Sequence, residues 1–126
     1  MPAATAGEVE RDFAEVLGST QELAGGTWEN RDDPTARACS SPFGVAGQQV
    51  PALRIAATPA GTSPGAVAGS VGEHWVELGY TVTTVPPGEP AVSQVQARGS
   101  AGEYLIFRVS LEAMTLQGES GCVTAP

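Results

Sequence analysis

Residues 63–85, SPGAVAGSVGEHWVELGYTVTTV, join a helix to a strand and decide the fold. The pair Ser63-Pro64 is typical of a helix start, because serine is a preferred N-cap residue and proline a preferred first helical residue. Apolar residues then recur at spacings of four, four and three, as on one face of a helix: Val67, Val71, Trp75 and Leu78. We therefore predict a helix over 64–78.

The end of this helix leads into a run of strands. Gly79 suits the left-handed position after a helix, and Tyr80 supplies the apolar contact of a Schellman-type end. Strand-like segments follow at 80–85, 92–97, 103–111 and 114–116. One face of the third of these carries Leu105, Phe107, Val109 and Leu111. Turn residues separate the segments about every ten residues, which predicts an antiparallel meander.

A second helix is expected before this region. Apolar residues at helical spacing run from Val9 to Leu23, and Gly25-Gly26 ends the pattern. Thr5 and Glu8 fit a capping box at its start. We predict a helix over 7–24.

The segment between the two helices has a weaker pattern. Residues 27–49 show no clear period, apart from a short strand at Trp28, and 52–57 alternate as a strand with Leu53, Ile55 and Ala57 on one face. A chain of 126 residues is about one domain. The prediction is a disordered tether over 1–6 and a single α+β domain over 7–126. Its two helices pack on one face of a mostly antiparallel sheet of four to five strands, with one disulfide.

The charge balance excludes several classes of function. The chain has 14 acids against six bases, all arginine, for a net charge of −8. An acidic chain without lysine lacks the basic footprint that nucleic acid or an anionic membrane surface requires. No stretch approaches the roughly 18 apolar residues of a membrane span. One histidine and two cysteines cannot build a zinc cluster. We expect no metal and no cofactor.

Cys39 and Cys122 are the only cysteines, and both lie in polar, loop-like sequence. A structural thiol has little packing role in such sequence, so we predict a disulfide, the alternative being two free thiols in the cytosol. Disulfides persist in oxidising compartments, yet the first residues have no basic and apolar secretory signal. We therefore expect a mature extracytoplasmic domain with an added initiator Met.

Helix 64–78 carries the only arrangement that suggests catalysis. Ser70, His74 and Glu77 share one face, as a nucleophile, a base and an orienting carboxylate would. A helix interior offers no free N–H groups for an oxyanion, so a solvated face is the better interpretation and we expect no enzyme activity. His74 with one nearby carboxylate is only half a metal site. The acidic turn at Glu29, Asp32 and Asp33 lacks the spacing of a calcium loop.

Four side chains are candidates for a binding surface: Trp28, His74, Trp75 and Tyr80. For Trp75 and Tyr80 the stronger interpretation is core packing, because they follow the apolar face of the helix. Trp28 lies in an irregular segment, so it fits either the core or an exposed contact with a partner, where tryptophan is enriched.

Two segments carry a family resemblance: WVELGYTV at 75–82 and LQGESGC at 116–122. With the meander between them, they resemble the ectodomains of small actinobacterial cell-envelope lipoproteins of unassigned function. The resemblance implies secretion, a disulfide and an N-terminal lipid tether on the outer face of the membrane, although the lipidated cysteine is missing here. It implies no activity.

The resulting expectation is a non-enzymatic domain at the cell envelope that binds a protein or a small ligand. Two alternatives remain open. One is a secreted immunity or inhibitor protein that masks a basic toxin or enzyme, steered by the charge of −8. The other is a small hydrolase that uses Ser70 and His74.

Overall fold

The computed structural model describes residues 6–33, 35–40, 46–85 and 92–124. In chain order its elements are α1 (Ala6–Ala24), β1 (Trp28–Asn30), β2 (Arg37–Ser40), β3 (Ala46–Gln49), β4 (Pro51–Ala57), α2 (Pro64–Glu77), β5 (Thr81–Val85), β6 (Ser93–Arg98), β7 (Tyr104–Val109), β8 (Ala113–Glu119) and β9 (Val123–Thr124). The predicted α+β class is confirmed. Residues 1–5 of the expected tether, and with them the Thr5 cap, lie outside the described residues, and Ala6 begins α1.

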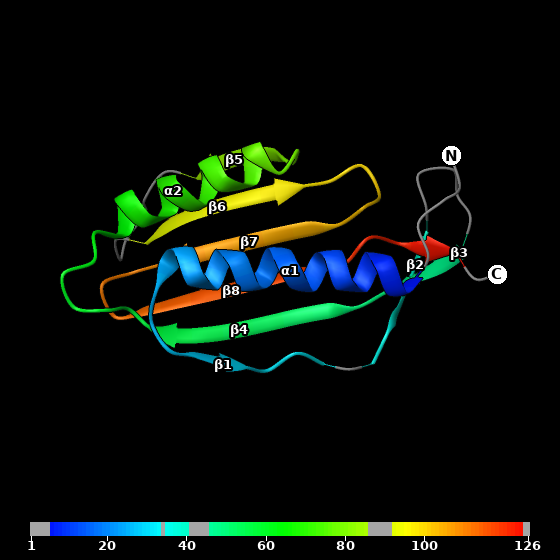
Figure 1. Ribbon diagram of the computed structural model, residues 1–126, viewed down its shortest axis with the longest axis horizontal. Coiled ribbons are helices and arrows are strands. Elements are labelled where there is room, and N and C mark those ends of the chain that lie inside the picture. Colours follow the sequence, from blue (N-terminus) through cyan, green and yellow to red (C-terminus); the bar gives the residue numbers. More distant parts are fainter. Residues whose placement is uncertain (1–5, 34, 41–45, 86–91, 125–126) are drawn as a thin grey trace.

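The main sheet has six strands, more than the four to five expected, in the order β1-β4-β8-β7-β6-β5. Every neighbouring pair is antiparallel. From β4 the chain crosses the sheet through α2 to the far edge, where β5 runs parallel to β4. The meander then returns strand by strand until β8 fills the place between β7 and β4 (Figure 1).

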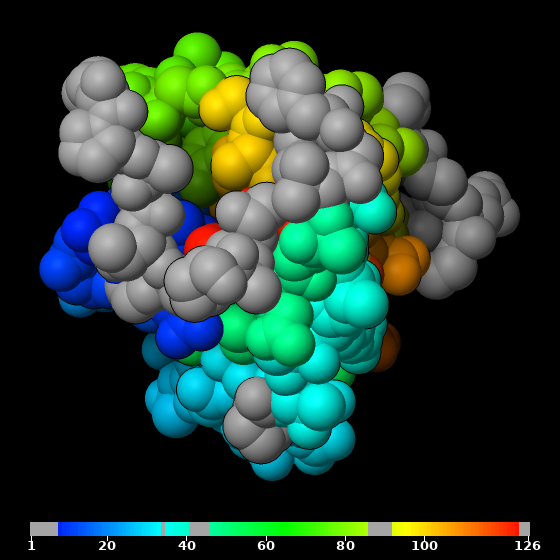
Figure 2. Space-filling model, turned by 90° about the vertical axis from the view of Figure 1, so that its right-hand side faces the viewer, coloured from blue at the N-terminus to red at the C-terminus, as the bar shows by residue number. Residues whose placement is uncertain are grey.

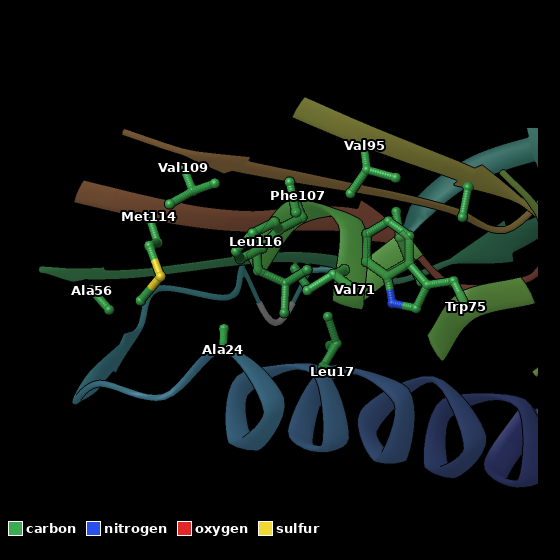
Figure 3. Close-up of a cluster of buried hydrophobic side chains, with 14 of the residues drawn as sticks. Leu17, Ala24, Ala56, Val71, Trp75, Val95, Phe107, Val109, Met114 and Leu116 are labelled. Atoms are coloured by element: carbon green, nitrogen blue, oxygen red, sulfur yellow. The ribbon is translucent and has the colours of Figure 1, made fainter. Parts of the chain in front are cut away.

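Both helices lie on the same face of this sheet, as predicted (Figure 1). The inward face of α1 carries Phe13, Leu17, Thr20 and Ala24, all buried. The core between helices and sheet is completed by Val71 and Trp75 from α2 and by Val95, Phe107, Val109, Met114 and Leu116 from the strands (Figure 3). The apolar residues of the chain are therefore concentrated in one layer, where they form a single core between the helices and the sheet.

The ends of α2 follow the sequence signals only in part. Leu78 is the C-cap, and the N–H of Gly79 donates to the carbonyl of Val76 while that of Tyr80 donates to the carbonyl of Trp75, each at 3.0 Å. With Gly79 at φ 98°, this is the predicted Schellman end. At the other end Ser63 holds the N-cap position with extended backbone, but its hydroxyl makes no capping hydrogen bond.

Strand β4 turns its larger apolar side chains, Leu53 and Ile55, away from the helices. Ala52 and Ala56 are buried under α1, while Leu53 is 37% exposed on the opposite face. Between them, Arg54 reaches into the helix side and bonds Gln21 at 2.6 Å and Asp32 at 2.9 Å. Leu111, expected on the apolar face of its strand, instead lies in the β7–β8 turn and is 76% exposed.

A small sheet in the order β2-β3-β9 was not predicted. It forms the end of the molecule that faces the viewer in Figure 2, where its cyan and green strands lie near the start of α1 in blue. Cys39 of β2 is bonded to Cys122, just before β9, with their Cα atoms 6.0 Å apart. The predicted disulfide is therefore confirmed, and it joins the small sheet to the end of the main one.

Strand β8 approaches β7 very closely at Gly118. A Cβ atom there would collide with the carbonyl oxygen of Tyr104 and lie 3.2 Å from the Cα of Leu105. We expect Gly118→Ala to lower the free energy of unfolding by about 1–3 kcal/mol, as overpacking does. Urea denaturation measures this, with Gly69→Ala as a control, because a Cβ at Gly69 meets nothing within 4 Å. Equal stability of Gly118→Ala and wild type would contradict the prediction.

Candidate binding surface

The four predicted surface residues do not form one site. Trp75 is fully buried, so its place among the surface candidates is corrected: its ring belongs to the core, and its Nε1 donates to Thr20 Oγ1 at 2.9 Å. Trp28 is partly buried against the same core, and its Nε1 donates to the carbonyl of Gly25 at 2.9 Å. Both tryptophans therefore pack in or against the core.

His74 joins the two helices. Its Nε2 lies 2.8 Å from Ser19 Oγ of α1, and the Ser19 hydroxyl also lies within donating distance, 3.1 Å, of the carbonyl of Val16. The partner of His74 is thus Ser19 and not Ser70, which is exposed. Sequence periodicity did not identify Ser19, because it cannot tell which residues of two helices will meet. The Ser19–His74 and Thr20–Trp75 hydrogen bonds together hold the helices side by side.

Tyr80 lines a hollow at the end of α2, together with Arg98 and Glu103. Burial raises the pKa of the Tyr80 hydroxyl, and the nearby carboxylates of Glu103 and Asp12 raise it further. The ring also packs against the core. This hollow is open to solvent on one side, so Tyr80 is a core residue with an accessible edge.

Two residues of the acidic turn, Asp32 and Asp33, form contacts that hold the loop after β1 in place. Asp32 forms an ion pair with Arg54 at 2.9 Å and accepts the N–H of Leu53 at 2.9 Å. Asp33 accepts the N–H of Thr35 at 2.9 Å, and hydrogen bonds from Thr35 lower the pKa of its carboxyl. Among the described residues, no group of three His, Cys, Asp or Glu side chains could hold a metal ion.

The second face of the main sheet is a further candidate surface. We call it the open face and define it by two cross-strand rows: Leu53, Gln117, Ile106, Gln96 and Thr83 in one, and Ile55, Thr115, Arg108, Gln94 and Val85 in the other. Both helices lie on the opposite side. An exposed antiparallel face is usually polar, but this one combines aliphatic side chains with uncharged amides and hydroxyls. Few of these side chains are charged, as in the core of a protein interface.

Charge is divided between the two sides of the molecule. The helices carry seven exposed acids: Glu8, Glu10, Asp12, Glu15, Glu22, Glu73 and Glu77. The two rows contain one base, Arg108, and Glu29 of β1 pairs with Ile55 at the end of the second row. The adjoining row holds one base and one acid, Arg98 and Glu119, on either side of Tyr104. The net charge of −8 therefore lies mainly on the helices, and the open face is close to neutral.

One end of the open face is hollowed beside the small sheet. The hollow is about 260 Å³ and is lined by Leu53, Tyr104 and Gln117, among others. The Tyr104 hydroxyl donates to Glu119 Oε1 at 2.8 Å, and Arg37 of β2 lies 3.8 Å from the same oxygen. Burial and the hydrogen bond to Glu119 raise the pKa of the Tyr104 hydroxyl above its usual range.

Comparison with known proteins identifies the fold alone. No protein-family model and no curated protein matches the chain. Among solved structures, it is similar to the crystal structure of a DUF4853 family protein from Actinomyces odontolyticus, with 15% identity and a TM-score of 0.69 over 98% of this chain and 71% of that chain. That neighbour is an actinobacterial protein of unknown function. In the described part of the chain, no helix has the length and apolar character needed to cross a membrane.

Proposed function

We propose that the chain is a non-enzymatic, extracytoplasmic domain, tethered by lipid to the outer face of the membrane, that binds a protein partner through the open face. The observation that carries this proposal is the composition of the open face. Leu53 is exposed, and Ile55 and Ile106 are half-buried among amides, on a side that the helices leave uncovered. Apolar side chains that remain accessible together on one face typically mark an interaction site.

A protein fits this surface better than a small ligand. Small-molecule sites are concave and typically enclose about 300–1,000 Å³. The hollow at the end of the open face, about 260 Å³, is smaller, and two of its arginines are already paired, Arg31 with Glu29 at 3.2 Å and Arg37 with Glu119 at 3.8 Å. The rest of the face is flat sheet, which suits a broad contact.

Three observations support the extracytoplasmic location and the absence of catalysis. The Cys39–Cys122 disulfide is typical of proteins outside the reducing cytosol. The Nε2 of His74, the single histidine, is hydrogen-bonded to Ser19. His74 lies within a helix, whose interior backbone N–H groups are already bonded and cannot stabilise an oxyanion. The likeness to an actinobacterial structure agrees with the resemblance of the sequence to envelope lipoproteins.

Site-specific crosslinking in the native envelope tests the proposed surface. A photo-reactive amino acid at Gln96 should give a discrete crosslinked product, while the same group at Glu15, exposed on α1, should not. Adding Ile106→Asp should weaken the contact about thirtyfold, the effect expected of a hot-spot residue, and Glu15→Gln should leave it unchanged. Equal products from Gln96 and Glu15, or indifference to Ile106→Asp, would contradict the proposal.

The acidic helices favour a second candidate function. Seven exposed acids on α1 and α2 would suit a secreted immunity or inhibitor protein that covers a basic toxin or enzyme. In the crosslinking experiment this function predicts the opposite result: the product forms from Glu15, and its formation falls steeply with salt.

A further inference from the structure

A groove runs between α2 and the edge strand β5, on the helix side of the sheet and away from the open face. It measures about 520 Å³. Val82 and Thr84 of β5 line one wall, and the other wall is a stripe of α2. On this stripe Gly69 and Gly72 have no side chain, and Val76 is 58% exposed. The groove is therefore open over Gly69, while at Gly72 the helix lies so close to the sheet that a Cβ would come within 3.2 Å of Val95 and 3.6 Å of Val82. Val76 makes the centre of the groove apolar.

The strand beside the groove is the last of the main sheet. β5 pairs with β6 on one side, and no other described strand pairs with it. Every second residue of an edge strand turns its N–H and C=O groups outward, and proteins usually protect such an edge with charges, proline or a bulge. Residues 81–85, TVTTV, contain neither charge nor proline. The edge is thus a ready template for one more strand.

The rim of the groove is acidic. Glu73 and Glu77 are both exposed and both line it. A strand added to β5 would send alternate side chains into the groove. A long basic side chain at such a position would lay its aliphatic stem over Val76 and bring its charged head to Glu73 or Glu77. A glutamate at the same position would meet two like charges.

The dimensions match a short extended segment. At 1.5 Å per residue, the stripe from Gly69 to Glu77 is about 12 Å long. A strand rises about 3.3 Å per residue, so the stripe spans about four residues of an added strand, close to the length of β5. Two groove-facing side chains fit within it, one for each glutamate.

We propose that this groove binds an extended peptide segment of a partner protein by strand addition to β5, with arginine or lysine at alternate positions. Main-chain hydrogen bonds to the β5 edge provide affinity, and the acidic rim selects basic side chains. This site is separate from the open face, so it does not depend on the function proposed above.

Fluorescence anisotropy with defined peptides tests the site. The probe is a short labelled peptide in which arginine alternates with valine. We expect it to bind the intact, disulfide-bonded protein. A peptide with proline in place of valine keeps the charge but loses the main-chain N–H donor at every second residue and favours a polyproline conformation over a strand, so it should bind at least about tenfold more weakly. A peptide with glutamate in place of arginine should show no binding.

Matched variants separate the groove from general charge attraction. Gly69→Leu should fill the groove and weaken binding at least about tenfold, while Gly65→Leu, one turn earlier and outside the lining, should not. Both replacements have open space for a Cβ, and leucine is a better helix former than glycine, so the fold should be retained. Glu73→Lys should weaken binding similarly, with Glu22→Lys on α1 as its control.

Four results would overturn the proposal: failure of the arginine–valine peptide to bind wild type, equal binding of its proline version, unchanged binding to Gly69→Leu, or a dimer of the free protein that Gly69→Leu makes monomeric. The last would show that a second copy of the chain occupies the groove. Ile106→Asp on the open face should leave peptide binding unchanged. A failure of the open face and a failure of the groove are therefore distinguishable.

Discussion

Removing the Cys39–Cys122 disulfide is expected to lower the free energy of unfolding by about 4–5 kcal/mol, the value that loop-closure entropy gives for a large loop. The bonded residues are 83 positions apart, so the bond restricts most of the unfolded chain. A domain of this kind has about 5–15 kcal/mol in total. The Cys39→Ser, Cys122→Ser double variant should therefore retain only part of its stability at room temperature.

Guanidinium denaturation of the double variant against wild type measures this loss. The control is wild type treated with a thiol-alkylating reagent without reductant, which should denature as the untreated protein does. The position of the bond predicts where the loss begins. The N–H of Cys122 donates to the carbonyl of Ala101 at 2.9 Å, and Val123 pairs with Gln48 of β3. Amide exchange should therefore rise first in β2, β3 and β9. A variant as stable as wild type would refute the prediction.

Trp75→Ala is the second large effect, with an expected loss of about 3–5 kcal/mol. The ring is fully buried between the helices and the sheet (Figure 3), and its removal leaves a cavity among the side chains that pack against it. The indole also provides one of the two hydrogen bonds between the helices, to Thr20.

Two further variants, Trp75→Phe and Val76→Ala, separate the contribution of the buried ring from that of its hydrogen bond to Thr20. Trp75→Phe keeps most of the apolar volume and loses the hydrogen bond, so its loss should be smaller, about 1–2 kcal/mol. Val76→Ala is next in sequence, but Val76 is 58% exposed and the change should stay within about 0.5 kcal/mol. Urea unfolding followed by circular dichroism gives all three values. If Trp75→Ala is no less stable than Val76→Ala, the assignment of Trp75 to the core is wrong.

Helices and meander strands could be predicted because each is encoded locally. The Val67–Leu78 stripe and the Gly79-Tyr80 stop fixed α2, and the alternation from Leu105 to Val109 gave the inward face of β7. The small sheet could not be predicted in this way. Its strands, RACS and AGQQ, lack an apolar alternation and are held by pairing and by the disulfide rather than by a buried face.

The candidate surfaces depend on tertiary arrangement. β4 offers apolar residues on both faces, and only the position of α1 determines that Ala52 and Ala56 are covered and Leu53 is not. Core packing, the stronger interpretation for Trp75, agrees with the structure, and of the two interpretations left open for Trp28 the structure supports packing against the core. The open face has no local motif, because its strands come from distant parts of the chain. The α2–β5 groove is built from consecutive elements, but only the packing of α2 on the sheet determines which of their side chains line it.

The place of β8 has a consequence for folding. This strand follows both of its neighbours in the chain, yet it lies in the interior of the main sheet, between β4 and β7. Without it, the β1–β4 pair and the β5–β7 meander are not joined by strand pairing. We therefore expect the six-stranded sheet to close late in folding, when β8 inserts between two parts of the chain that are distant in sequence.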